Sequence, residues 1–179
     1  MSKTSFEAMN CPIAQTLNLV GEWWSMLILR NAFCGMTRFQ DFQQHLGISS
    51  ATLTARLQRL TEHGIFQRVR SPHDGRAYEY RLTEKGLELS PMLLALSEWG
   101  EKWVPNADGR RIRFVERATG LDIAGVGAIA ADGKTVLAIA DLEVLPGAGG
   151  DCKTADLLNG RTTQPMADTG VSRPQPGTL

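Results

Sequence analysis

Side chains that bind phosphates and base edges are concentrated between positions 49 and 76 of the sequence. From 50 to 76 there are five arginines and two acidic residues, a local charge of +3, although the 19 basic and 19 acidic residues of the whole chain cancel. Arginine pairs with guanine and glutamine with adenine, and hydroxyl groups and arginine also contact phosphates. This pattern predicts contact with double-stranded DNA. The predicted contact residues are Ser49, Thr52, Ala55, Arg56, Gln58, Arg59, Arg68, Arg70, His73 and Arg76.

A second candidate for chemistry is Cys11, which directly precedes Pro12 at the expected start of a helix. The positive end of a helix favours the reactive thiolate form of a cysteine. Cys11 is therefore a candidate redox-sensing thiol, and the alternative is an inert cysteine. We predict that Cys34 is a buried packing residue and that Cys152 lies in an exposed loop. With these spacings the three cysteines form neither a disulfide framework nor a zinc motif.

The sequence lacks the residue sets that common enzymes need. It holds no Ser/His/Asp arrangement, no phosphate-binding glycine loop and no paired carboxylates. Its three histidines, His45, His63 and His73, all fall within the predicted DNA-binding elements. We therefore expect no catalysis, no cofactor and no metal. The N-terminus lacks the apolar core of a signal peptide, and no apolar run nears the roughly 18 residues of a membrane span. We expect a soluble, cytoplasmic protein without a membrane partner.

Composition divides the chain unevenly. Eleven of its twelve aromatic residues precede position 105, whereas eleven of its eighteen glycines follow it. We predict a main domain over 8–104, a β-rich extension over 107–158 and a disordered tail over 159–179. The extension has no assigned role beyond packing or partner contact. Its predicted strands are 111–118, 122–130 and 134–143, the last two joined by a turn at 131–133.

Apolar spacing places the basic residues on a pair of helices followed by two strands. Leu53, Leu57 and Leu60 recur at helical spacing, and a shorter helix precedes them, with a capping box beginning at Thr37 and a terminating Gly47. Two alternating segments, 65–70 and 77–82, follow with a turn between them. A short helix, a tight turn, a longer helix and a hairpin make a winged helix-turn-helix.

The leucines also predict which side of the longer helix meets DNA. If they form its buried face, 100° per residue places other side chains opposite them and Arg56 on the flank. Small residues there would let the helix enter a major groove closely. The residues predicted to lie opposite are Ala51, Thr52, Ala55, Gln58 and Arg59.

Two apolar helices are predicted at the ends of this domain. One spans 12–21, and the other begins at Thr83 and carries Trp99 and Trp103. The second apolar stripe is longer than a small core needs, so we predict that both helices form a subunit interface. Trp23 and Trp24 are predicted to be core residues, and the alternative is that they line an effector pocket.

An ordered series of motifs over residues 8–104 resembles the HxlR-type winged-helix regulators, which are similar to MarR regulators. The residues and this resemblance together predict the fold class α+β, with a winged helix-turn-helix domain, dimerisation helices and a small β-rich C-terminal extension. It implies a dimeric transcription regulator that responds to an oxidant, an electrophile or a metabolite, with Cys11 at the position of the sensor in oxidant-sensing members. The motifs are Cys11-Pro12, Leu19-Val20-Gly21-Glu22-Trp23-Trp24, Leu27-Ile28-Leu29-Arg30, Gly35-Met36-Thr37-Arg38-Phe39-Gln40-Asp41, Gly47-Ile48-Ser49, Leu53-Thr54, Arg56-Leu57, Gly64-Ile65, Leu82-Thr83 and Trp99-Gly100.

Three functions remain open at this point. The first is a homodimeric repressor or activator on a palindromic DNA operator, with a possible small-molecule effector. The second is a winged helix used only for protein interaction, which the local charge of +3 over 50–76 disfavours. The third is an enzyme with its site in the extension, which the lack of catalytic residue sets disfavours.

Overall fold

The computed structural model describes residues 6–72, 76–104, 106–143, 145 and 147–151. The described residues divide into two compact units, one up to Val126 and one from Gly127 on, and each is considered by itself. Residues 106–126 group with the winged helix in the first unit, and the predicted domain limits at 104 and 107 remain a prediction. The predicted tail, 159–179, lies outside the described residues.

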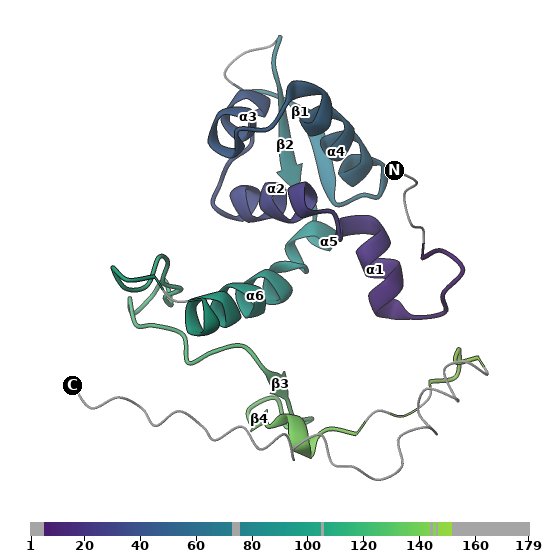
Figure 1. The fold of residues 1–179 in the computed structure, drawn as a ribbon, viewed down its shortest axis with the longest axis vertical. Coiled ribbons are helices and arrows are strands. Elements are labelled where there is room, and N and C mark those ends of the chain that lie inside the picture. The colour runs from purple at the N-terminus through teal and green to yellow at the C-terminus, as the bar shows by residue number, and fades with distance from the viewer. Residues whose placement is uncertain (1–5, 73–75, 105, 144, 146, 152–179) are drawn as a thin grey trace. The chain divides into compact units, whose positions relative to one another are not determined.

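The first unit is a winged helix-turn-helix flanked by helices, which confirms the predicted fold class (Figure 1). Its core is a continuous apolar cluster to which α2, α3, α4 and the hairpin all contribute. Ring centroids of Phe42 and Phe66 lie 6.4 Å apart in an edge-to-face contact at its centre. The elements are α1 (Pro12–Val20), α2 (Trp23–Phe33), α3 (Phe39–Leu46), α4 (Ser50–Glu62), β1 (Phe66–Arg70), β2 (Tyr78–Leu82), α5 (Glu84–Leu87) and α6 (Ser90–Trp103).

The turn between α3 and α4 depends on one glycine. Gly47 ends α3 with φ of +61°, in the left-handed region that side chains other than glycine disfavour. The next residue, Ile48, is buried, and Ser49 then caps α4. The short connection fixes α4 against the core next to α2 and β1.

The start of α3 differs from the predicted capping box. The helix begins at Phe39, and its N-cap residue is Arg38, which makes no side-chain capping bond. Thr37 instead joins the hairpin, because its carbonyl accepts the Tyr80 N–H at 2.8 Å. Arg38 forms an isolated antiparallel bridge to Glu79. Pairing with β2 therefore decides the conformation of residues that the local sequence assigned to a cap.

The long C-terminal helix is divided in two. Thr83 caps α5 as predicted, and its hydroxyl accepts the Gly86 N–H at 3.1 Å. The chain then restarts at Ser90, with Pro91 in the first turn of α6. Proline has no N–H to bond back into a preceding turn, so it begins a new helix rather than bending one.

The extension contains less β structure than its sequence predicts. In the first unit only an isolated bridge, Val115 to Asp122, marks the strands expected at 111–118 and 122–130. In the second unit, β3 (Ala128–Ile129) pairs with β4 (Val136–Leu137), and a short 3-10 helix, η1 (Ile139–Asp141), follows. The predicted turn is present: Gly133 has φ of +72°, and Asp132 accepts the N–H groups of Lys134 and Thr135.

Candidate nucleic-acid interface

Helix α4 presents a continuous exposed side to solvent. Its opposite side is fully buried, with Leu53, Leu57 and Leu60 all at 0% exposure, as their spacing predicts. The exposed side chains of the first two turns are short. The longer Gln58 and Glu62 follow them, and the Gln58 amide donates to the Glu62 carboxylate at 2.8 Å. Short side chains allow the close approach that a helix needs to enter a major groove. The residues of this exposed side are Ser50, Ala51, Thr54, Ala55, Gln58 and Glu62.

Ser49 and Thr52 are tied together at the start of α4. The Ser49 hydroxyl oxygen accepts the Thr52 N–H at 3.2 Å, and the two hydroxyl oxygens are 2.8 Å apart. Both predicted contact residues therefore stabilise the first turn of the helix. That turn also presents backbone N–H groups, which favour a phosphate.

Both arginines of α4 have partners within the protein. Arg59 was predicted opposite the leucines, but its guanidinium is half-buried and donates at 2.6 Å to the backbone carbonyl of Asn18 in α1. Arg56 forms a 3.0 Å ion pair with Glu22, just before α2. Helix α1 covers this flank of α4, and the leucine spacing alone does not reveal a neighbour on a flank. The same spacing also missed Thr54, which is exposed.

The hairpin forms the predicted wing. Strands β1 and β2 are antiparallel, with Arg68 opposite Tyr80 and Arg70 opposite Tyr78. The Arg68 guanidinium lies 3.8 Å from the centroid of the Tyr78 ring, a cation–π contact that orients it. Arg68, Arg70 and Arg76 are exposed, whereas His73 lies outside the described residues.

A buried carboxylate fixes the base of the wing. Glu79 is 4% exposed, accepts the Ser71 hydroxyl at 2.9 Å and accepts two guanidinium N–H groups of Arg81 at 2.9 and 3.2 Å. The bonds from Arg81, followed by the bond from Ser71, hold the pKa of Glu79 below its ordinary value of 4.5, although burial acts in the opposite direction. The Glu79 carboxylate is therefore charged at neutral pH, and its bond from Ser71 joins the end of β1 to β2.

The described cysteines occupy opposite ends of two consecutive helices. Cys11 is the N-cap of α1, half-buried, with Pro12 in the first turn as predicted. The prediction for Cys34 is wrong: it is exposed, because it lies beyond the last residue of α2, in the turn that leads to Gly35. Cys152 lies outside the described residues.

The prediction for Trp23 is also wrong. Its side chain is 86% exposed on the first turn of α2, because Ile28 and Leu29 occupy the side of that helix that faces the core. Trp24 is half-buried and packs against the core. Both tryptophans border a shallow hollow that Leu17 also lines.

Neither a metal centre nor a membrane helix is found in the part of the chain that the structure describes. No three His, Cys, Asp or Glu side chains gather closely enough there to hold a metal ion. No helix in the same part is long and apolar enough to span a membrane.

Comparison with known proteins identifies the family of the winged helix. The sequence model of the HxlR-like helix-turn-helix family matches residues 19–108. The HTH-type transcriptional regulator Rv3095 of Mycobacterium tuberculosis is 41% identical over 108 residues, which cover 60% of this chain and 68% of the relative. These relatives are transcription regulators and not enzymes.

Two solved structures are similar beyond the winged helix. PA1607, described as a transcription factor, is 42% identical with a TM-score of 0.72, and the match covers 80% of this chain and all of that one. PA1374 of Pseudomonas aeruginosa is 35% identical with a TM-score of 0.56, over 83% of this chain and all of that one. Matches of this extent include residues after 108, so part of the extension is shared. The winged helix, the family match and these relatives agree, and the chain belongs to the HxlR-like helix-turn-helix family of transcription regulators.

Proposed function

We propose that the protein is a homodimeric transcriptional repressor that binds a palindromic operator and responds to an oxidant, an electrophile or a small metabolite. The observation that carries the proposal is the division of α4 into a fully buried leucine side and an exposed side of short residues. A helix with this division, held at both ends by the fold, is suited to enter a major groove.

Base recognition is assigned to the exposed side of α4. Ala51 and Ala55 allow close approach, and Gln58 is positioned to pair with adenine. Thr54 joins the predicted contacts because it is exposed on the same side. Arg56 and Arg59 support the placement of α4 from its covered flank.

Affinity is assigned mainly to the wing. Arg68, Arg70 and Arg76 are exposed on or beside the hairpin, and such arginines bind phosphates or enter a minor groove. Each phosphate contact releases counterions, so operator binding weakens steeply as salt rises. His73 is kept as a predicted contact.

The dimer is proposed to form through α1 and α6. Both helices expose large apolar side chains, and α6 buries none of its residues within one chain. A second copy would cover these faces and hold two reading helices about one DNA turn apart, roughly 34 Å. The exposed apolar residues assigned to this interface are Ile13 at 71%, Leu17 at 47%, Trp99 at 58% and Trp103 at 50%.

Cys11 is proposed as the responding thiol. It begins α1, so its modification would disturb a helix that contacts α4 through Arg59 and is assigned to the dimer interface. A transcription regulator must be in the same compartment as the DNA that it binds, and we therefore propose that the protein is cytoplasmic.

A DNA shift assay with the promoter next to the protein's own gene tests the proposal. We expect a single specific complex with one dimer per site, and an affinity that falls by orders of magnitude as salt rises from 50 to 200 mM. A scrambled fragment of equal length is the control. Equal binding to both fragments would contradict a sequence-specific regulator, and no binding at low salt would favour the protein-interaction alternative.

A further inference from the structure

An apolar groove of about 780 Å³ lies in the first unit, away from the exposed side of α4. Helix α2 forms one wall with Met26, Leu27 and Phe33, α6 forms another, and Ile112 and Phe114 close a third. The volume is in the range of sites that hold a small molecule.

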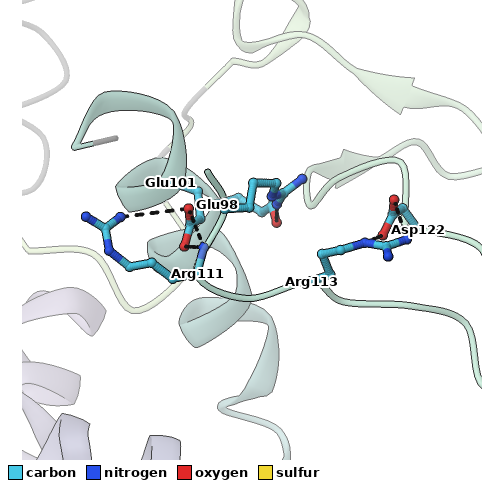
Figure 2. A network of polar contacts seen from close by, with 6 residues as sticks. Glu98, Glu101, Arg111, Arg113 and Asp122 are labelled. Carbon is cyan, nitrogen blue, oxygen red and sulfur yellow. Dashed lines mark hydrogen bonds and ion pairs between the residues drawn. The ribbon is translucent and has the colours of Figure 1, made fainter. Parts of the chain in front are cut away.

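The segment that carries Ile112 and Phe114 is hydrogen-bonded to α6 through charged residues. The Arg111 backbone N–H donates to the Glu101 carboxylate at 3.2 and 3.3 Å (Figure 2). The Arg111 guanidinium donates to the Val104 carbonyl at 2.9 Å. The guanidinium of the neighbouring Arg110 donates at 2.6 Å to Glu98, which lies one turn before Glu101 in α6. The Glu101 side chain is only 9% exposed, so its charge is satisfied within the protein. Residues after the winged helix thus form one wall of the groove.

One corner of the groove is polar and basic. Arg30 directs Nε and Nη2 at Oδ1 of Asn31, at 3.0 and 2.8 Å, and Asn31 is 2% exposed. Because the amide oxygen accepts from Arg30, the amide nitrogen faces His45 and donates to its Nδ1 at 3.0 Å. In the neutral ring the proton is then on Nε2, which remains a donor. Among the described residues no carboxylate pairs with Arg30.

We propose that this groove binds an amphipathic carboxylate, with its apolar body between α2 and α6 and its carboxylate at Arg30 and His45. An apolar cavity with a few convergent donors is the usual form of a small-molecule site. The cation of Arg30, held by a neutral amide, complements an anion. That this ligand is the effector of a transcription regulator rests on the proposed function. That the groove binds such a ligand does not depend on it.

The position of the groove gives its ligand a route to the DNA-binding elements. His45 is in the last turn of α3, the first helix of the helix-turn-helix, and Arg30 is in α2. The apolar body would contact α6, which is assigned to the dimer. A ligand in the groove would therefore contact α2, α3 and α6 at once and fix the position of the helix-turn-helix relative to the dimer helix α6.

The test uses 2-naphthoate and its neutral analogue 2-naphthamide with the full-length protein in isothermal titration calorimetry. The parent is expected to bind the carboxylate about ten-fold tighter, as one charge-assisted bond provides. Arg30→Gln should equalise the two ligands, and Ser97→Trp, inside the groove, should weaken both. Arg117→Gln and Ala118→Trp, at exposed positions outside the groove and outside α1 and α6, are the matched controls. No binding by the parent, equal binding of the two ligands, or a preference kept by Arg30→Gln would overturn the proposal.

A second measurement needs no variant. Cys34 is exposed and lines the groove, so 2-naphthoate should slow its alkylation by iodoacetamide in the parent and leave Cys11 unaffected. If Cys34 is already protected without ligand and becomes reactive on dilution, a second copy fills the groove and the proposal is wrong. The DNA shift assay distinguishes failure of this proposal from failure of the proposed function. A protein that binds the operator but not 2-naphthoate refutes only the ligand site. A protein that binds 2-naphthoate but no operator refutes only the proposed function.

Discussion

Arg59 of α4 donates a 2.6 Å hydrogen bond to the backbone carbonyl of Asn18, in the last turn of α1. The last carbonyls of a helix lack partners within it, so the guanidinium satisfies one of them. The bond joins the helix proposed to read DNA to a helix proposed to form the dimer. It also changes what is expected of Arg59, which the sequence alone assigned to a base contact.

The first prediction concerns this bond. Arg59→Ala should lower the free energy of unfolding by about 1–3 kcal/mol, because a half-buried charged hydrogen bond is lost. Operator affinity should fall to a similar degree on every sequence variant, since α4 is displaced rather than deprived of a base contact. Urea unfolding at fixed protein concentration and a panel of single-base operator variants measure both effects.

Gln58→Ala is the matched control for Arg59. Gln58 is exposed on α4, so its truncation should change stability by less than about 0.5 kcal/mol. It should instead relax the preference at one base pair by about 1–3 kcal/mol. A one-base effect from Arg59→Ala, with unchanged stability, would contradict the assignment of Arg59 to α1.

The second prediction concerns the wing. Arg68→Ala and Arg70→Ala should each weaken binding to all DNA sequences alike and reduce the slope of log affinity against log salt by about 1. Arg117→Ala, which removes an exposed charge outside the winged helix, should leave the slope unchanged. Filter binding over a salt series gives the slopes, and identical slopes for all four proteins would remove the wing from the interface.

The third prediction concerns the dimer. Trp99→Asp should raise the dimer dissociation constant by at least about 30-fold, because a large apolar contact is replaced by a buried charge. Leu121→Asp is the control, since Leu121 is 68% exposed and lies outside α1 and α6. Light scattering over a concentration series measures the constant. A parent that is monomeric at micromolar concentration would refute the dimer itself.

The fourth prediction concerns the thiols. Diamide or a quinone should release the parent from DNA, and Cys11→Ser should remain bound. Cys34 is exposed and should react as well, yet Cys34→Ser should keep the response because Cys34 is not part of α1. Equal release from the parent and Cys11→Ser would exclude Cys11. Release from neither would leave a metabolite as the effector.

The fifth prediction concerns pH. The pKa of Glu79 is lowered in the folded protein, so its contribution to stability is present above its ordinary value of 4.5 and is lost as the pH falls below it. The parent should therefore lose stability relative to Glu79→Gln on acidification. Melting temperatures of both proteins between about pH 6 and pH 3 test this, because the other carboxylates are common to both. Parallel curves would show that Glu79 does not carry a shifted pKa.

The sequence by itself determined the winged helix and its buried side. Leu53, Leu57 and Leu60 repeat with the helical period, and Gly47 permits the turn before them, so local spacing and backbone freedom were sufficient. Pro12 likewise marked the start of α1 behind Cys11. The helix period, the glycine turn and the proline at a helix start all depend on residues that are close together in the sequence.

Only the tertiary structure decided which polar side chains face inward. Arg59 bonds a carbonyl 41 residues away, and Thr37 pairs with β2 instead of capping a helix. The polar corner at Arg30 and His45 forms because α2 and α3 pack together. A long polar side chain can reach either solvent or a partner that is distant in the sequence. The spacing of apolar residues along the chain reveals neither that partner nor which flank of a helix a neighbouring helix covers.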